Sequence, residues 1–267
     1  MEIHYALQTC DVAFNQAEKR FCCETKAELI RKCVTSFFIS VKTASELQPH
    51  VKHNIMIFDD NSTKETVEFL EKIIKKFSSD NIKVNLTGIE SRSVMGSIRH
   101  CYEWLLANGK DLVYQVQDDY LFEKNAITET IDIFFRLSNE VNTQAIITPY
   151  NAPYLWSVYY KNKTAPRTIF FGAYRYWIQI YDISCSFLTS HKVLTDNKDL
   201  LEVFLSMNPK DPDLEKLSLN KILVQRGVLA VCPFESIALH MQTDYEKDPY
   251  VDWKKLWESV DENIIDR

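Results

Sequence analysis

Two pairs of adjacent aspartates each follow a short apolar run in this sequence. The stretch Leu112–Phe122, LVYQVQDDYLF, places Asp118 and Asp119 after such a run, and NIMIFDDNST places Asp59 and Asp60 in the same way. Runs rich in Val, Ile, Tyr and Phe favour β-strands, and adjacent side chains on a strand point to opposite faces. One acid of a pair could therefore face a bound cation or a ribose hydroxyl while the other faces a neighbouring loop. For either pair alone, an Asp-rich turn or a helix cap is the alternative.

The elements that would position these acids alternate between strand and helix. Strand-like segments cover Ile3–Cys10 and residues 54–60, 82–88 and 112–118, and helical spacing of apolar residues covers about 26–42, a segment starting at Ser62 or Thr63, and about 94–107. This alternation predicts an α/β fold with a mainly parallel central sheet, right-handed crossovers and flanking helices. Because open α/β folds bind ligands at the carboxyl ends of their strands, we expect both acid pairs at that edge.

The second half of the chain is less regular. Helices are predicted at about 125–137, 196–205 and 214–226, strands in QAIITPY, SCSFLTS and VLAVCPFESIALH, and a tail helix with Trp253, Leu256 and Trp257 on one face, as a lid or packing element. Residues 150–182 are dense in aromatic side chains. They form either core and a hairpin packed on the sheet or a platform on which an acceptor sugar stacks.

Composition limits the classes of protein. With 267 residues and 46% hydrophobic content, the chain can bury the core of one large domain, which we expect to span residues 1–267. Seven cysteines without a CxxC pair disfavour a disulfide framework and a zinc–thiolate site. No apolar run reaches the roughly 20 residues of a membrane span, and the first residues lack the features of a signal peptide. We therefore expect no transmembrane segment and a cytoplasmic location.

The charge balance bears on the partners. A net charge of −6 gives no electrostatic reason to expect nucleic acid or an anionic membrane. An anionic small ligand would need a metal ion or local cations. Arg92, Arg167 and Arg175 are the candidates for contact with a diphosphate, because the planar guanidinium matches phosphate oxygens. Ordinary surface solvation is the alternative for each of them.

Four motifs follow one another along the chain: DDNST (59–63), MGSIRHCYEWL (95–105), VQDDY (116–120) and the stretch 212–240, which ends in ALH. In this order they resemble motifs of the nucleotide-sugar glycosyltransferases of the GT-A fold, in particular the family 2-like group. The matching family elements are DDxS, a Gly-x-x-x-Arg-Asn helix start, the DxD-type metal motif, and a segment with a catalytic acid, a helix, a Gly, a strand and a terminal His. The resemblance covers most of the chain as a pattern.

The resemblance implies a nucleotide-sugar-binding half, residues 1–122, and an acceptor-binding half with a C-terminal helix, residues 123–267. It implies a base contact for Asp60 and a ribose contact for Asp118, within a donor-binding set of Thr9, Asp59, Asp60, Gly96, Arg99, Gln117 and Asp118. It places a divalent metal at Asp119, with His240 as an imidazole ligand. Oxygen ligands with one imidazole suit Mn²⁺ or Mg²⁺ better than Zn²⁺. A structural role is the alternative for His240.

One residue departs from the family pattern, and one role has several candidates. Gln117 stands where the metal motif has an acid, which removes one potential ligand. For inversion at the anomeric carbon, a carboxylate must take the proton of the acceptor hydroxyl. Glu215 is the first candidate, near the start of the helix that ends at Gly227, with Asp213 and Asp211 as rivals. The alternative for Glu215 is an acid that interacts only with the helix dipole.

The sequence therefore predicts a metal-assisted glycosyltransferase that moves a sugar from a nucleotide donor, with a UDP-sugar favoured, to a saccharide or glycoconjugate hydroxyl. An inactive glycan-binding or scaffold protein of the same fold is one alternative, which Gln117 keeps open. A sugar-1-phosphate nucleotidyltransferase is another, although it would need a Gly-rich basic loop after the first strand, where LQTCDVAF has none. No GxGxxG follows a strand, which disfavours a dinucleotide dehydrogenase.

Overall fold

The computed structural model describes residues 1–12, 23–140, 143–151, 167–183, 186–208, 211, 214–241 and 248–266. Its strands are β1 (Glu2–Thr9), β2 (Lys52–Asp60), β3 (Ile82–Ile89), β4 (Leu112–Gln117), β5 (Tyr120–Phe122), β6 (Ala145–Ile147), β7 (Ile169–Phe171), β8 (Tyr176–Ile180), β9 (Phe187–Ser190), β10 (Leu229–Pro233) and β11 (Ala238–His240). Its helices are α1 (Lys26–Leu47), α2 (Lys64–Phe77), α3 (Val94–Asn108), α4 (Ala126–Glu140), α6 (His191–Asp196), α7 (Lys198–Ser206), α8 (Leu214–Leu217), α9 (Leu219–Arg226), α10 (Trp253–Ser259) and the 3₁₀ helix η2 (Glu262–Asp266).

Within the described residues, nine strands form one sheet in the order β3-β2-β1-β4-β9-β6-β10-β8-β7, and β11 pairs with β5 in a second sheet. β1 is parallel to both β2 and β4, β3 is parallel to β2, and β6 is parallel to β10. β9 is antiparallel to β4 and β6, and β8 is antiparallel to β10 and β7. β8 and β9 thus run against the other strands. The prediction of an α/β fold with a mainly parallel sheet is confirmed, with a mixed second half.

Two predicted elements in the second half are divided, and a third is preceded by an additional helix. VLAVCPFESIALH forms β10 and β11, because the chain leaves the large sheet after Pro233 and pairs with β5 instead. The helix predicted at 214–226 breaks at Ser218, whose hydroxyl donates to the carbonyl oxygen of Leu214 and so competes with the helical pattern. The helix predicted at 196–205 is preceded by α6 and begins as α7 after Asn197, which donates to the carbonyl of Val193.

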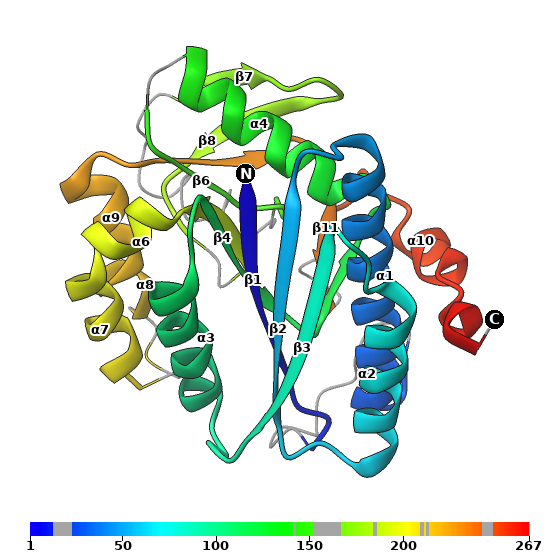
Figure 1. Cartoon of the computed structure of the whole chain (residues 1–267). Coiled ribbons are helices and arrows are strands. Elements are labelled where there is room, and N and C mark those ends of the chain that lie inside the picture. Colours follow the sequence, from blue (N-terminus) through cyan, green and yellow to red (C-terminus); the bar gives the residue numbers. More distant parts are fainter. Residues whose placement is uncertain are drawn as a thin grey trace.

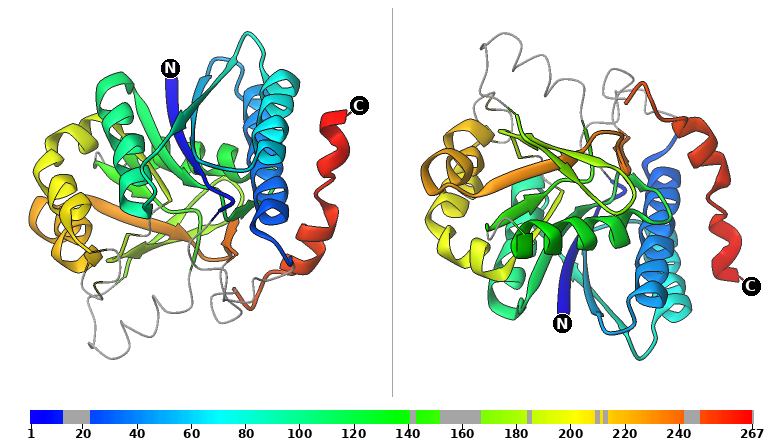
Figure 2. Two further views of the ribbon diagram at one scale, coloured as in Figure 1. Left: turned by 90° about the horizontal axis from the view of Figure 1, so that it is seen from below. Right: turned by 90° about the horizontal axis from the view of Figure 1, so that it is seen from above.

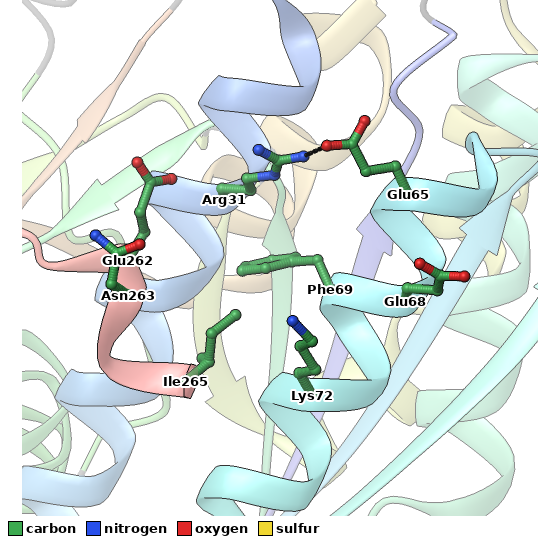
Figure 3. Close-up of a pocket in the computed structure, with 8 residues that line it drawn as sticks. All are labelled: Arg31, Glu65, Glu68, Phe69, Lys72, Glu262, Asn263 and Ile265. Carbon is green, nitrogen blue, oxygen red and sulfur yellow. Dashed lines mark hydrogen bonds and ion pairs between the residues drawn. The ribbon is translucent and has the colours of Figure 1, made fainter. Parts of the chain in front are cut away.

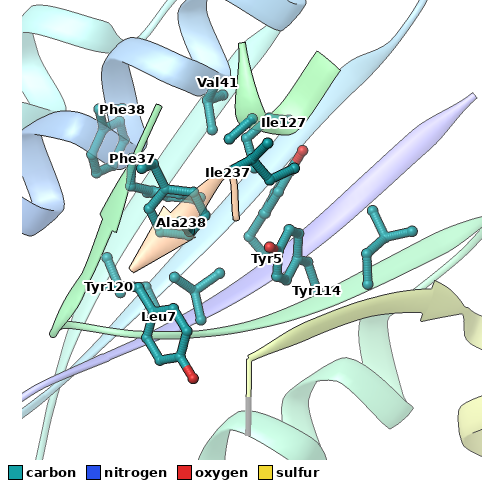
Figure 4. Packing of buried hydrophobic residues seen from close by; sticks show 14 of the residues in the cluster. Tyr5, Leu7, Phe37, Phe38, Val41, Tyr114, Tyr120, Ile127, Ile237 and Ala238 are labelled. Atoms are coloured by element: carbon teal, nitrogen blue, oxygen red, sulfur yellow. The ribbon is translucent and has the colours of Figure 1, made fainter. Parts of the chain in front are cut away.

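Helices cover both faces of the sheet (Figure 1), and each face has its own apolar core. Alternation along β1 explains the division, because Tyr5 and Leu7 pack with the helices α1, α2 and α4 while Ala6 packs with α3 and α6–α9. Figure 4 shows the first of these cores, where Tyr5 and Phe37 approach edge to face with ring centroids 5.6 Å apart. The strand edge that carries the acids is therefore supported from both sides.

The start of α2 is held by a residue from another loop. We expected Ser62 or Thr63 to cap this helix, and Thr63 is the cap residue, but its side chain makes no capping hydrogen bond. Instead, Asp11 accepts hydrogen bonds from the backbone N–H of Thr63 (2.9 Å) and the hydroxyl of Thr66 (2.6 Å). The chain beyond β1 is thus tied to the helix that follows β2.

The aromatic segment 150–182 contains both kinds of side chain that we considered. Tyr150 and Trp177 are fully buried, as expected for core. Phe171, Tyr174 and Tyr176, on the β7–β8 hairpin, are between 56% and 69% exposed. Tyr154, Trp156, Tyr159 and Tyr160 lie outside the described residues. The hairpin prediction is confirmed for the described part, and the acceptor platform stays a prediction.

The C-terminal segment packs on the outside of the helical layer formed by α1 and α2, as Figure 2 shows. Trp253 and Trp257 are buried in the core of this face, and the ammonium of Lys32 lies 5.8 Å from the ring of Trp257. η2, α1 and α2 enclose a surface pocket of about 290 Å³ (Figure 3), lined by Arg31, Glu65, Glu68, Phe69, Lys72, Glu262, Asn263 and Ile265. No residue predicted for the site lines it. Among the described helices, none has the length and apolar character needed to cross a bilayer.

One buried residue of the central sheet is a histidine, His53 on β2. Tyr5 and His53 lie on the paired strands β1 and β2, and the tyrosine hydroxyl is 2.9 Å from Nδ1 of His53. The side chain of His53 is fully buried, which lowers its pKa from 6.5 to about 4. An unfolded chain therefore takes up a proton at His53 at a higher pH than the folded protein does.

This difference predicts a loss of stability in mild acid. As the pH falls from 6.5 towards 4, we expect His53 to lower the free energy of unfolding by about 3 kcal/mol, because the unfolded state binds the proton first. Denaturant unfolding of wild type and His53→Asn across this range measures the effect, since asparagine keeps a polar atom near Tyr5 but does not titrate. The exposed His50→Asn is the control. Equal pH slopes in wild type and His53→Asn would contradict the assignment.

Candidate functional site

The carboxyl ends of three parallel strands form the centre of the site. Thr9 pairs with Asp59 in the β1–β2 ladder, and its hydroxyl donates to Oδ1 of Asp59 at 2.9 Å. Directly after β1, the backbone N–H of Cys10 donates to Oδ2 of Asp118 at 3.0 Å. Asp59 and Asp118 are both buried. The parallel register thus brings the two acid pairs to one edge of the sheet, as the sequence predicted.

The small second sheet brings His240 to Asp119. In the antiparallel β5–β11 pair, His240 lies opposite Tyr120, and their rings stack with centroids 4.8 Å apart. Nε2 of His240 is 3.5 Å from Oδ2 of Asp119, and the backbone N–H of Met241 donates to the carbonyl oxygen of Asp119. These residues are far apart in the sequence, so only the β5–β11 ladder makes them neighbours.

Helix α1 adds a cation that we did not predict. Nζ of Lys26 lies 2.5 Å from Oδ1 of Asp118 and 3.8 Å from Oδ2 of Asp119. All three side chains are at most 11% exposed. Burial raises the pKa of Asp118, against the opposing charge of Lys26 and with the charge of Asp119 adding to the effect. The group is a compact cluster of two acids and one ammonium.

A sequence signal for Lys26 was present. Thr25-Lys26-Ala27-Glu28 has the spacing of a capping box, and the Thr25 side chain accepts from the N–H of Glu28. This places Lys26 at the first position of a helix, where the helix dipole disfavours a positive charge. A lysine there, just after a loop that leaves the carboxyl edge of the sheet, points to a partner outside the helix.

Asp60 organises the neighbouring loop. Oδ2 accepts from the hydroxyls of Ser91 and Ser97, and Oδ1 from the N–H of Arg92 and the amide of Asn61. An ionised carboxylate has about four acceptor positions, so these donors use them all. Burial acts to raise the pKa of Asp60, but the hydrogen bonds from Ser91, Ser97 and Arg92 hold it below its usual value. A base contact for Asp60 stays a prediction, and it requires one of these donors to give way.

The backbone around Asp60 is strained. Asn61 and Arg92 have φ angles of 58° and 51°, and among the described residues they are the only non-glycine residues with positive φ. Such conformations persist where surrounding contacts enforce them, and they cluster at functional sites. Both flank the Asp60 carboxylate. The side chain of Arg92 is exposed beside this loop, so it remains a candidate for contact with an anionic ligand.

Two predicted arginines are engaged elsewhere. Arg99 lies on α3 but faces α7, where its guanidinium donates to Glu202 and to the carbonyl oxygen of Leu205. Arg175 donates to Glu129 and Glu123 at 2.6 and 2.9 Å and so ties the β7–β8 hairpin to the start of α4. The structure therefore gives each of them a structural partner. The predicted contacts of Arg99 with the nucleotide sugar and of Arg175 with its diphosphate are not tested by these positions and stay predictions.

The remaining candidates are placed as follows. Gln117 is the last residue of β4. Its side chain is partly buried and makes no hydrogen bond with the part of the chain that the structure describes. Arg167 is partly buried just before β7, and Asp211 precedes α8. Asp213 and the side chain of Glu215 lie outside the described residues. The identity of the catalytic base is therefore not tested.

The donor set at Asp119 fits a hard divalent cation. Mg²⁺ or Mn²⁺ binds oxygen and imidazole ligands at roughly 2.0–2.2 Å, so two adjacent ligand atoms of an octahedral site lie about 3 Å apart. Asp119 Oδ2 and His240 Nε2 lie 3.5 Å apart, so a small approach of the two side chains would let both bind one ion. In the described ranges, no group of three or more His, Cys, Asp or Glu side chains is arranged to hold a metal. The described residues therefore fit a site whose remaining ligands come from substrate phosphates and water.

No protein-family model and no curated protein matches the sequence. Among solved structures, UDP-glucose pyrophosphorylase from Acinetobacter baumannii superposes with a TM-score of 0.50 at 11% identity, over 97% of this chain and 92% of that chain. The chain shares its α/β fold. A UDP-glucose pyrophosphorylase in complex with UDP-glucose gives 0.49 at 10% identity, over 99% and 100% of the chains. An active-site mutant of LgtC gives 0.44 at 13% identity, over 86% and 72%.

Gly96, one of the predicted donor-site residues, is required by close packing. A Cβ atom there would lie 2.6 Å from Cβ of Ser91 and 2.7 Å from Oγ of Ser93, the cap of α3. Ser91 also holds Asp60. Gly96 thus lets the loop that carries these hydroxyls close onto the first turn of the helix.

Replacing Gly96 by alanine should therefore disturb this loop. We expect Gly96→Ala to lower the free energy of unfolding by about 1–3 kcal/mol, because the added methyl group overpacks against the loop. Denaturant unfolding measures the change. Gly88→Ala, on β3, is the matched control, since a Cβ there meets nothing within 4 Å. Equal free energies of unfolding for the two variants would show that the close packing at Gly96 does not contribute to stability.

Proposed function

We propose that this protein is a nucleotide-sugar glycosyltransferase that transfers a sugar, from a UDP-sugar in the favoured case, to a hydroxyl of a saccharide or glycoconjugate. The proposal rests chiefly on one observation, the convergence of Asp118, Asp119 and His240 at the carboxyl edge of the sheet. The shared fold with a UDP-glucose pyrophosphorylase supports a nucleotide-binding first half, residues 1–122. The second half, residues 123–267, would hold the acceptor within the same domain.

Each residue of the cluster has a defined task in this proposal. Asp119 and His240 would hold Mn²⁺ or Mg²⁺, which as a Lewis acid stabilises the negative charge that develops on the leaving diphosphate. Asp118, fixed by Cys10 and Lys26, would accept from a ribose hydroxyl only after a change of partner. The ring of Tyr120 stacks on the imidazole of His240 and so fixes the plane of the ring, whose Nε2 lies 3.5 Å from Asp119.

The acceptor side requires a general base. Glu215 is our first choice, in α8, and Asp213 and Asp211, which come before α8 in the sequence, are the rivals, because the chain from here leads through α9 and β10 back to β11. A carboxylate there would take the proton from the attacking hydroxyl and thus give inversion at the anomeric carbon. The exposed aromatics of the β7–β8 hairpin are candidates for stacking on an acceptor sugar.

A sugar-1-phosphate nucleotidyltransferase is the second candidate. The likeness in fold to UDP-glucose pyrophosphorylase favours it. Against it, the chain after β1 reads CDVAFNQAEKR and contains no glycine, whereas close approach of backbone to a triphosphate favours glycine. The two reactions differ in their products, so one experiment separates them.

Incubation with a panel of nucleotide sugars, Mn²⁺ and mixed saccharide acceptors tests the proposed function. We expect release of nucleoside diphosphate, with the largest rate for a UDP-sugar. In a parallel reaction, UTP and sugar 1-phosphates should give no pyrophosphate. Pyrophosphate release instead would establish the nucleotidyltransferase, and the absence of both products would leave a binding protein.

Variants of the cluster should affect this turnover selectively. We expect Asp119→Asn and His240→Phe to lower kcat/KM by about 100-fold, a loss of about 3 kcal/mol of transition-state stabilisation. Phenylalanine keeps the stacking on Tyr120, so His240→Phe should fold normally. Asp196→Asn, which removes an exposed ion pair with Lys192, is the control. Full activity in His240→Phe would exclude the imidazole as a ligand.

A further inference from the structure

The ammonium of Lys26 lies beside the two acids at which we propose a metal ion. It is 2.5 Å from Asp118 and 3.8 Å from Asp119, the carboxylate that also approaches His240. A divalent cation bound by Asp119 and His240 would therefore lie close to a positive charge. Like charges at this range repel strongly in a site with little water. The ammonium and the metal cannot both have their best positions.

The charge of the cluster shows why such a cation is present. Two ionised aspartates and one ammonium sum to −1 when His240 is neutral (+1 − 2 = −1). Two adjacent acids this deeply buried require a counter-charge, because burial of an unpaired carboxylate is costly. Lys26 supplies it in the ligand-free protein. A diphosphate, however, would meet a negative site, and a divalent cation would change the sum from −1 to +1.

The placement of Lys26 also allows it to move. It is the first residue of α1, and a flexible four-carbon stem joins its ammonium to the backbone. Below it, α1 is firmly anchored, since the hydroxyls of Ser36 and Ser40 accept from the backbone N–H groups of Phe122 and Ile127. The ammonium can therefore leave the acids without a change in the helix or in β5.

We propose that Lys26 is an internal counter-cation that competes with a divalent metal for the Asp118–Asp119 pair. In the ligand-free protein it keeps metal affinity low. A nucleoside diphosphate reverses this, because its oxygens complete the metal ligands and also accept the displaced ammonium. This coupling rests on the proposed function, whereas the competition itself concerns the acids, the lysine and the metal alone.

Calorimetric titration of the full-length protein with Mn²⁺, without nucleotide, tests the competition. We expect Lys26→Met to bind Mn²⁺ at least about tenfold more tightly than wild type, a gain of about 1.4 kcal/mol. Lys26→Arg keeps the charge and should bind as weakly as wild type. Lys42→Met, on the same helix and paired with Glu46 at the surface, should have no effect. Unchanged or weaker binding of Mn²⁺ to Lys26→Met would overturn the proposal.

Removal of the counter-charge should also destabilise the variant, which gives a second measurement. We expect Lys26→Met to have a lower Tm than wild type, and Mn²⁺ to raise its Tm by more than that of wild type, because ligands that bind the folded state stabilise it. Lys26→Gln, which can still donate to Asp118, serves if the methionine variant does not fold. An equal Mn²⁺-induced shift in wild type and the neutral variant would contradict the competition.

A repeat of the titrations with UDP present tests the coupling. We expect UDP to tighten Mn²⁺ binding by about tenfold or more in wild type and by less in Lys26→Met, because the variant has no ammonium to displace. An equal gain in both proteins would overturn the coupling. If UDP binds neither protein, the coupling and the proposed UDP donor fail together, while the titrations without nucleotide still decide the role of Lys26.

Discussion

The burial of two adjacent aspartates at the end of β4 is the constraint on which the site depends. Neither Asp118 nor Asp119 can stay ionised there without favourable partners, and the partners come from three separate segments. Cys10 supplies a backbone N–H and Lys26 an ammonium, and the imidazole of His240 lies 3.5 Å from Asp119. Satisfying one pair of acids therefore fixes the exit of β1, the start of α1 and the end of β11 relative to one another.

Helix α1 transmits this constraint to the rest of the fold. Its first residue meets the acids, while Ser36 and Ser40 in its middle hold β5 and the start of α4 through buried hydrogen bonds. β5 in turn pairs with β11 and so carries His240 to the site. The small second sheet is thus a bridge between the two halves of the chain, and its position depends on polar contacts within an otherwise apolar layer.

These contacts mark the limit of what the sequence predicts. The alternation of strands and helices follows from periodicity, because periodicity reports which side chains face a core, and this alternation brings the two acid pairs to one edge of the sheet. The approach of His240 to Asp119 was expected only from the resemblance of the motifs to those of GT-A glycosyltransferases. Lys26 and Asp11 do not, since their partners lie on other segments and only the folded backbone brings them together. Arg99 and Arg175 are also residues whose partners could not be read from the sequence. Their residue type suits phosphate, but the fold gives them carboxylates and carbonyl oxygens as partners.

The two acid pairs look alike in the sequence and differ in their donors. Asp60 is surrounded by neutral donors: the hydroxyls of Ser91 and Ser97, the amide of Asn61 and the backbone N–H of Arg92. These groups are short side chains or backbone in the two loops beside Asp60 and in the first turn of α3. Asp118 instead faces a charged donor at the end of a long side chain, which in our proposal withdraws when a metal ion binds. Neutral, fixed donors keep a carboxylate ionised and the loop rigid, as the strained backbone at Asn61 and Arg92 requires. A mobile cation instead leaves its carboxylates available to a competing ion. The first pair is therefore suited to shape one wall of the site, and the second to exchange partners within it.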